Sequence, residues 1–125
     1  NEIIPDVVKD WNTLSDSYSA KYYPHVSVGW DASPRTHEGI PGIVKNNTPE
    51  NFEVALRLAK DYLDRHPEQH RLVTVNSWNE WTETSYLEPD DRNGYGYLDA
   101  VRRVFVEEAE KADRVVIGGG AAVAR

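Results

Sequence analysis

The spacing of apolar side chains predicts three amphipathic helices, because each segment repeats them at intervals of three and four residues. The first helix runs from about residue 4 to residue 18, and Pro5 is tolerated only near its first turn. Its apolar face carries Ile4, Val7, Val8, Trp11, Leu14 and Tyr18. The third helix directs Tyr97, Leu98, Val101, Phe105 and Ala109 to its inner face.

The helix between them has clear signals at both ends. Thr48 supplies a hydroxyl at the N-cap, Pro49 fits the first helical position, and Glu50 suits the positive end of the helix dipole. The helix should stop near His66, because Pro67 disfavours helical backbone in the residue before it. Its apolar face consists of Phe52, Ala55, Leu56, Ala59, Tyr62 and Leu63.

Two short strands are predicted between the helices. Val26 and Val28 alternate with polar residues, which predicts a strand over about 24–30. The run from Leu72 to Val75 is continuously apolar and predicts a buried strand. The end of the chain predicts a last short strand and then a flexible tail over 118–125.

Helices that alternate with strands predict parallel strands and an α/β fold. Two strands do not form a complete sheet, since both faces of a parallel sheet need covering. A (β/α)8 barrel needs eight strands and about 250 residues. The 125 residues are therefore expected to be part of a larger α/β unit.

Composition narrows the range of possible functions. The net charge is −7, so the basic surface that nucleic-acid binding requires is not expected. The chain has no cysteine, which excludes disulfides and favours a reducing compartment such as the cytoplasm. It has no apolar run of the roughly 20 residues that span a bilayer and no leader-like start. It does have four tryptophans, which aromatic-lined sugar sites and ordinary cores both use.

Two long loops leave the carboxyl ends of the predicted strands, which is where α/β proteins gather their chemistry. The first loop begins Gly-Trp-Asp at 29–31, and the second begins Asn-Ser-Trp-Asn-Glu at 76–80. If the strands are parallel neighbours, one edge of the sheet brings together Asp31, Arg35, Glu80 and Glu83. This convergence predicts a functional site.

Glu80 and Glu83 are the candidate catalytic pair. Glycoside cleavage uses two carboxyl groups, of which one handles the proton of the leaving oxygen and the other acts as base or nucleophile. Indole rings can shield one carboxyl from water while its partner stays solvated, and that difference separates an acid from a base. The alternative is that both are loop acids, solvated or paired with arginine. Glu88, Asp90 and Asp91 have the pattern of turn and surface acids.

The aromatic and polar neighbours are candidate substrate contacts, and each has a structural alternative. Trp78 and Trp81 are either sugar platforms or core residues that hold the loop, and we expect one of each. Asp31 and Arg35 either bind sugar hydroxyls or pair with each other. Tyr86 and Tyr95 are likewise either substrate contacts or structural residues. The predicted substrate-binding set is Trp30, Asp31, Arg35, Trp78, Asn79, Trp81 and Tyr86.

No metal or cofactor site is predicted. His66 and His70 are four residues apart, but Pro67 separates them and the HExxH order of zinc proteases is missing. A histidine at a helix C-terminus is explained by the helix dipole. Gly118, Gly119 and Gly120 are not followed by the strand and helix that a phosphate-binding loop needs.

Four motifs together resemble a known family. They are GWDASPR at 29–35, TPENF at 48–52, NSWNEWTETSYLEPD at 76–90 and GYGYLDA at 94–100. The chain is similar in these motifs to the WbsX-like proteins, which resemble glycoside hydrolase family 99. The resemblance implies the C-terminal part of a (β/α)8 barrel, with residues 1–125 as a partial domain. Thr84 stands where the pattern usually has glycine.

The resemblance also implies a mechanism. In the related hydrolases, which retain configuration at α-mannosides, the residue matching Glu80 is the base for the sugar's own 2-hydroxyl. That hydroxyl attacks the anomeric carbon and gives an anhydro-sugar. The residue matching Glu83 is the general acid for the leaving oxygen and then the base for water.

We therefore expect a retaining, α-mannosidase-like glycoside hydrolase that acts on a polysaccharide or glycan. The alternatives are a glycosyltransferase and a non-catalytic glycan-binding module of cell-surface polysaccharide biosynthesis. The expected partners are a glycan substrate and either the missing N-terminal barrel segment or another copy of the chain. Apart from them, the 125 residues should be inactive.

Overall fold

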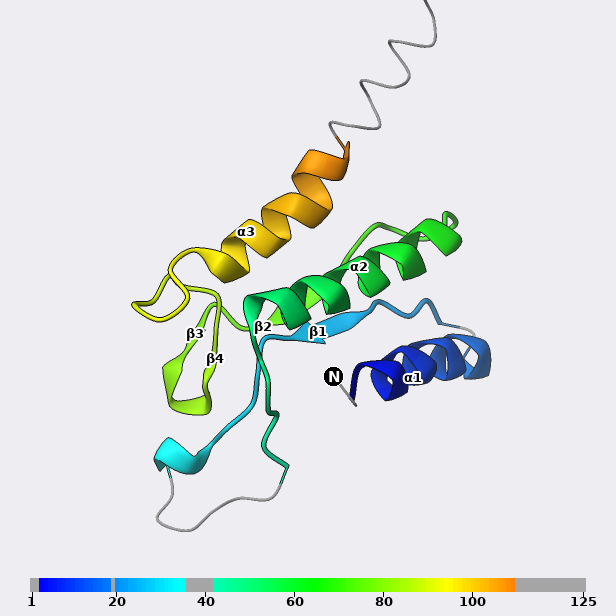
Figure 1. Ribbon diagram of the computed structural model, residues 1–125. Helices are drawn as coiled ribbons and strands as arrows, with labels where there is room; N and C mark the ends of the chain where they lie inside the picture. The colour runs from blue at the N-terminus through cyan, green and yellow to red at the C-terminus, as the bar shows by residue number, and fades with distance from the viewer. Residues whose placement is uncertain (1–2, 19, 36–41, 110–125) are drawn as a thin grey trace, which may run out of the picture.

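The computed structural model describes residues 3–18, 20–35 and 42–109, and shows three helices around a small parallel sheet (Figure 1). The predicted tail over 118–125 lies outside these residues. The principal elements are α1 (Ile3–Ser17), β1 (His25–Ser27), α2 (Pro49–Arg65), β2 (Thr74–Asn76) and α3 (Gly96–Arg102). This order confirms the predicted alternation of helices and strands. The barrel itself stays a prediction.

The sheet consists of β1 and β2, which pair in parallel. His25 lies opposite Thr74, and Ser27 lies opposite Asn76. The connection between the strands runs through α2, which packs against β1 (Figure 1). A parallel pair needs such a crossover, because its strands cannot be joined by a tight turn. The predicted parallel neighbours are therefore confirmed, although β1 is shorter than the predicted 24–30.

Both ends of α2 follow the sequence signals. The Thr48 hydroxyl accepts a hydrogen bond from the backbone N–H of Asn51 at 3.4 Å, and Pro49 is the first helical residue. At the other end, the backbone N–H of the C-cap His66 donates to the carbonyl of Leu63. The start and stop predicted from Thr48 and Pro67 are confirmed.

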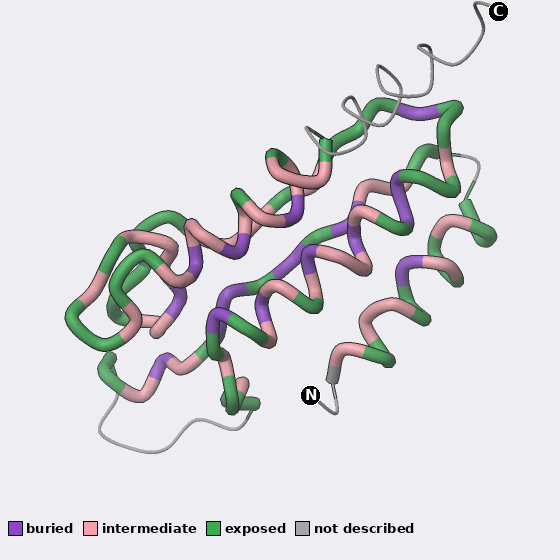
Figure 2. Tube along the Cα trace, turned by 45° about the horizontal axis from the view of Figure 1, so that its top comes forward, coloured by how far each residue is buried: buried purple, intermediate pink, exposed green. Residues whose placement is uncertain are grey.

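The core lies between α2 and its neighbours (Figure 2). Val26 and Val28 of the first strand segment are buried, and they meet the apolar face of α2, where Leu56, Ala59 and Tyr62 are at most 1% exposed. Trp11 from α1 is 3% exposed and contacts Tyr62 edge to face. Burying side chains of this size is the main stabilising contribution to the fold.

The other face of the sheet is polar. His25 Nδ1 and Thr74 Oγ1 are 2.8 Å apart, and the Ser27 hydroxyl donates to Asn76 Oδ1 at 2.7 Å. All four side chains belong to facing positions of the two strands. The sheet therefore has one apolar face under the helices and one hydrogen-bonded polar face.

Two predictions of burial are wrong. The second strand is Thr74–Asn76 rather than 72–75, and it is not buried, since Thr74 is exposed and Val75 and Asn76 are only partly buried. Leu72, which precedes the strand, is 48% exposed. The described sheet has two strands and helices on one face only, so β2 lacks the cover that a buried strand needs.

In the third helix the buried residues are Tyr97, Ala100 and Val104, and Ala109 is exposed. The predicted Val101 and Phe105 are partly buried against the same core, so the inner face follows the predicted spacing as far as Phe105. A π-helical segment spans Arg103–Glu107.

Ion pairs join α2 to the last helical segment. Glu53 accepts hydrogen bonds from Arg57 and Arg103, both at 2.7 Å, and Arg57 also contacts Glu108. The Glu53 side chain is 19% exposed. None of the described helices is long and apolar enough to cross a membrane.

Candidate active site

The candidate site forms where the two chain segments after β1 and β2 meet. After β1, a 3-10 turn spans Ser33–Arg35. After β2, the chain forms a small antiparallel hairpin of β3 (Asn79–Glu80) and β4 (Ser85–Tyr86), joined by a 3-10 turn over Trp81–Glu83. The sequence predicted an irregular loop here. We call the segments 29–35 and 77–93 together the rim.

The backbone joins the two parts of the rim. The backbone N–H of Asp31 donates to the carbonyl of Glu83 at 2.7 Å. Gly29 lies so close to the hairpin that a Cβ atom there would be 2.7 Å from the carbonyl oxygen of Thr84. The approach of the two segments therefore depends on the absence of a side chain at residue 29.

Arg35 bridges the two candidate catalytic acids. Its Nη1 is 2.6 Å from Glu83 Oε1, and its Nη2 is 3.1 Å from Glu80 Oε2. The Nε–H also donates to the hydroxyl of Thr82 at 2.7 Å. The structure thus brings Glu80, Glu83 and Arg35 together, as the parallel strands predicted.

The two carboxyl groups have different surroundings. The Glu83 side chain is 14% exposed and the Glu80 side chain is 51% exposed. Glu83 is therefore largely shielded from water and Glu80 is solvated, and both contact the same guanidinium.

Thr84 follows the pair in a left-handed conformation, with φ 52° and ψ 32°. Its backbone N–H donates to the carbonyl of Trp81 and closes the 3-10 turn. Glycine adopts this conformation without strain, whereas a β-branched residue does not. The turn keeps the backbone that glycine favours, although threonine occupies the position.

Asp31 lies at the rim, but it does not pair with Arg35. Its Oδ1 accepts a hydrogen bond from the backbone N–H of Ser33 at 2.9 Å. Hydrogen bonds from Ser33 hold the pKa of the Asp31 carboxyl below its usual value. The interpretation of Asp31 and Arg35 as a mutual ion pair is therefore wrong, since Arg35 pairs with the glutamates instead.

The Trp81 indole forms a supported aromatic surface beside the acids. It stacks on Tyr86 with ring centroids 3.9 Å apart and an angle of 22° between the planes. Its Nε1–H donates to Glu88 Oε2 at 2.8 Å. Burial, followed by a hydrogen bond with Asp90, raises the pKa of the Tyr86 phenol to about 12. Hydrogen bonds therefore hold both rings, with Glu88 on Trp81 and Asp90 on Tyr86.

The other predicted contacts lie around this surface. Trp78 is 53% exposed and Trp81 is 46% exposed, so the expectation that one of them packs in the core is wrong. Trp30 is 39% exposed, Asn79 is exposed in β3, and Tyr95 is 67% exposed. Three exposed tryptophans, Trp30, Trp78 and Trp81, therefore belong to the rim, whereas Tyr95 lies just outside it.

Three residues of the site have roles that sequence reasoning missed. Thr82 accepts from Arg35, Glu88 holds Trp81, and Asp90 bonds Tyr86 as well as the backbone N–H of Arg92. Asp90 is therefore a turn residue, as predicted, with an added role. No turn signal in the sequence marked the hairpin of β3 and β4, which brings Glu88 within reach of Trp81.

Among the described residues, no group of three or more histidines and acids is placed to hold a metal ion. His66 lies against the ring of Tyr62, with centroids 4.3 Å apart, and its Nδ1 is 3.2 Å from Glu68. These contacts are explained by the position of His66 at the C-terminal end of α2.

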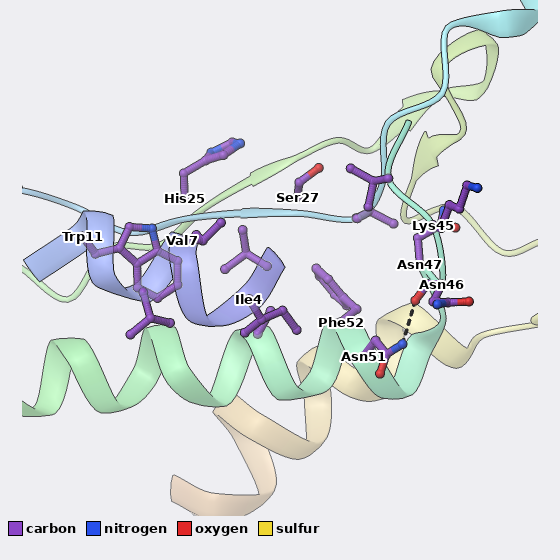
Figure 3. Close-up of a pocket in the computed structure, with 15 residues that line it drawn as sticks. Ile4, Val7, Trp11, His25, Ser27, Lys45, Asn46, Asn47, Asn51 and Phe52 are labelled. Atoms are coloured by element: carbon purple, nitrogen blue, oxygen red, sulfur yellow. Dashed lines mark hydrogen bonds between the residues drawn. The ribbon is translucent and has the colours of Figure 1, made fainter. Parts of the chain in front are cut away.

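A separate cavity of about 140 Å³ lies between α1, β1 and α2 (Figure 3). Ile4, Val7, Trp11 and Phe52 line its apolar part, and Lys45, Asn46 and Asn47 line its polar end. Figure 3 shows His25 and Ser27 pointing away from Phe52, on the polar side of β1. Neither glutamate lines this cavity, so it is distinct from the rim.

The fold and the rim define an α/β protein with a pair of carboxyl groups at the ends of its parallel strands. The chain matches the family described as Glycosyltransferase WbsX over residues 4–101. It belongs to this WbsX family, as the motifs indicated. No solved structure matches it significantly.

Two curated relatives, from two strains of Xanthomonas campestris pv. campestris, bear the name "Uncharacterized protein WxcX". Each is 35% identical to the chain over 115 residues. The match covers 86% of the chain and 16% of each relative. The chain therefore corresponds to about a sixth of the length of these proteins.

Proposed function

We propose that the full-length polypeptide is a carbohydrate-active enzyme of polysaccharide metabolism and that Glu80 and Glu83 are its catalytic carboxyl groups. The observation that carries this proposal is that both side chains reach the guanidinium of Arg35 at the carboxyl ends of two parallel strands. Enzymes with such sheets place their chemistry at that edge. Membership of the WbsX family supports a glycan as the substrate.

The proposed reaction is hydrolysis of a glycosidic bond with retention. Glu80 removes the proton of the sugar 2-hydroxyl, whose oxygen attacks the anomeric carbon while the bond to the leaving oxygen breaks. Glu83 gives its proton to that leaving oxygen. Glu83 then takes a proton from water, the water oxygen attacks the anomeric carbon while the bond from that carbon to O2 breaks, and Glu80 returns its proton to O2.

The exposed aromatic side chains supply the proposed sugar contacts. Trp81 offers a rigid indole, because Tyr86 supports one face and Glu88 fixes its N–H. Large aromatic faces bind the apolar side of sugar rings while polar neighbours take the hydroxyls. Trp30 and Trp78 extend the aromatic contacts, and Asp31 and Asn79 are proposed hydroxyl partners.

The charge of the rim favours a neutral sugar over a nucleotide sugar. The rim contains six acids but only two cations, Arg35 and Arg92. Arg35 is already bound to two carboxylates. A diphosphate would need positive charge, which this edge lacks. Hydrolysis of a neutral glycan is therefore the preferred reaction.

Transfer of a sugar to an acceptor is the second candidate, because the family is described as a glycosyltransferase. Transfer and hydrolysis share the first step, and they differ in whether an acceptor hydroxyl or water attacks the intermediate. The third possibility is a glycan-binding module, which would use the aromatic surface without turnover.

We also propose that the chain contributes the C-terminal part of a (β/α)8 barrel. The parallel pair of β1 and β2, with α2 as crossover, is the repeating unit of that fold. The relatives are long enough to supply further strands, since the match covers 16% of each. Those strands, or a second copy, are the proposed partners of the sheet.

The test uses the full-length polypeptide with aryl glycosides and mannans, and separately with nucleotide sugars and acceptor glycans. Glu80→Gln and Glu83→Gln should each lower kcat by about a hundredfold or more while glycan binding is kept. Asp91→Asn, at an exposed acid of the same rim, is the matched control and should keep kcat.

Product analysis separates the candidates. Free reducing sugar with retained configuration supports hydrolysis, and elongated acceptor supports transfer. Binding of glycans by the wild type without any turnover identifies a binding module. Normal kcat in both glutamine variants would overturn the proposed roles of the glutamates. The isolated 125 residues should not turn over substrate.

A further inference from the structure

We propose that Arg35 is a positioning residue, which holds the carboxyl groups of Glu80 and Glu83 in their working arrangement. The inference rests on the proposed function and gives Arg35 a role different from the hydroxyl contact predicted from the sequence. Arg35 affects turnover through the two glutamates and has little effect on substrate affinity.

The geometry of Arg35 supports this role. Three different nitrogens of its guanidinium donate to three side chains of one 3-10 turn and its N-cap, Glu80, Thr82 and Glu83. A guanidinium is planar and carries its donors in a fixed fork, so three simultaneous bonds fix the relative positions of the acceptors. A lysine ammonium is a single point of charge and cannot reproduce that spacing.

The turn that carries Arg35 is itself held in place. The backbone N–H of Arg35 donates to the carbonyl of Ala32 at 3.0 Å, and Asp31 accepts from the backbone N–H of Ser33. The backbone N–H of Asp31 also donates to the carbonyl oxygen of Glu83. This backbone bond holds the turn at Glu83, and the Arg35 side chain adds the contacts that hold Glu80, Thr82 and the two carboxyl groups.

Charge gives a second reason. The guanidinium lies between the two carboxyl groups and attracts the oxygens of both, so it holds them toward one point. Without Arg35, Glu80 is free to turn toward water, since its side chain is 51% exposed. A displacement of about 1 Å in a catalytic group can cost about a hundredfold in rate.

The experiment compares Arg35→Ala, Arg35→Lys and Arg102→Ala in the full-length polypeptide, with the glycan that the wild type turns over. Arg102 is the matched control, because it lies on α3 and pairs only with Asp99 and Glu107 among the described residues. Arg35→Ala should lower kcat by about a hundredfold and change KM by less than about threefold. Arg35→Lys should stay near the alanine variant, and Arg102→Ala should match the wild type.

Chemical rescue adds a readout that a purely structural role would not give. Free guanidinium at concentrations below those that unfold the protein should restore part of kcat in Arg35→Ala, and the same concentration of ammonium should not. A variant that raises KM and keeps kcat would show that Arg35 contacts the substrate, and would overturn the inference. An unchanged kcat would overturn it as well.

A second measurement keeps the inference testable if the wild type shows no turnover, which would count against the proposed function alone. Hydrogen exchange of the amides over 80–84 should be at least about tenfold faster in Arg35→Ala than in Arg102→Ala. Equal exchange in the two variants would show that Arg35 does not hold this turn.

Discussion

The backbone N–H of Asp31 donates to the carbonyl oxygen of Glu83 at 2.7 Å, so main chain meets main chain between the segments that follow the two parallel strands. A backbone bond of this kind does not depend on which side chains flank it. It sets the distance between the turn over Trp81–Glu83 and the segment 29–35. The side chain of Arg35 then acts within a distance that the backbone has set.

Substitution of Gly29 by alanine should separate these two segments. The new Cβ would lie 2.5 Å from Asn47 Nδ2 and 2.7 Å from the backbone oxygen of Thr84. Asn47 can rotate away, but the backbone oxygen can move only with the hairpin. We expect a loss of about 1–3 kcal/mol in the free energy of unfolding, measured by urea denaturation.

Gly94→Ala is the control for that experiment. Gly94 has φ 55° and no atom within 4 Å of an added Cβ, so only backbone strain is introduced. Its cost should be about 1 kcal/mol. An equal or smaller loss at Gly29 would show that the contact with Thr84 is unimportant.

Thr84→Gly should stabilise the protein. Threonine at φ 52° carries a left-handed strain of about 1–2 kcal/mol, and the extra flexibility of glycine when unfolded offsets about half of it. The expected gain is about 0.5–1 kcal/mol, read as a higher Tm. Thr84→Ala keeps a Cβ atom and should give no comparable gain. A fall in Tm for the glycine variant would contradict this account.

The Tyr86 phenol should affect stability at high pH. Its pKa is raised from 10.0 to about 12 in the folded protein, so the neutral phenol stabilises the fold below pH 10. That contribution should be lost as the pH rises from about 10 to about 12, because the unfolded chain ionises first. Tyr86→Phe should remove this part of the pH dependence.

The measurement for Tyr86 is phenolate absorbance during a pH titration, combined with unfolding at each pH. Asp90→Asn should bring the titration of Tyr86 closer to pH 10, since Asp90 contributes to the raised pKa. Identical titrations of the wild type and Tyr86→Phe would contradict the assignment.

Trp81→Ala should weaken glycan binding. Loss of the stacked surface is expected to reduce affinity by about threefold to tenfold, measured by calorimetry in the Glu80→Gln background so that the ligand stays intact. Trp81→Phe keeps an aromatic face and should retain most of the affinity. Val54→Ala, at an exposed apolar residue of α2, should leave affinity unchanged.

Glu53 should stabilise the contact between α2 and the last helical segment in a pH-dependent way. Hydrogen bonds from Arg103 and Arg57 lower its pKa below the usual 4.5. Its contribution is therefore present above about pH 4.5 and is lost as the pH falls toward the lower value. Glu53→Gln should cost about 0.5–1 kcal/mol at pH 7, and the difference from the wild type should shrink in acid. A constant difference across this range would contradict the assignment.

Local signals predicted much of the fold. Thr48, Pro49 and Pro67 marked the ends of α2, because capping hydroxyls and prolines act on the backbone beside them. The alternation of helices and strands predicted the parallel pair. Burial was predicted less well, since Leu72 is 48% exposed although Val73 beside it packs against the core. Burial depends on which other segments cover a strand, and a short run of residues does not contain that information.

The site shows the same division. The position of Glu80 and Glu83 after a strand was enough to predict that they would lie near Arg35, because parallel strands end at one edge. The hairpin between them and the support of Trp81 by Glu88 were not predicted. Pairing of the two acids with arginine was the structural alternative to a catalytic pair, and the structure shows that pairing with Arg35.

Periodicity, capping and chain connectivity were enough to predict the ends of α2, the parallel strands and the edge that carries the acids. These signals act over a few residues or a single crossover. The partner that each rim side chain takes became known from the folded structure alone. That choice depends on distances between segments far apart in the chain, and Gly29 and the Asp31–Glu83 bond set those distances.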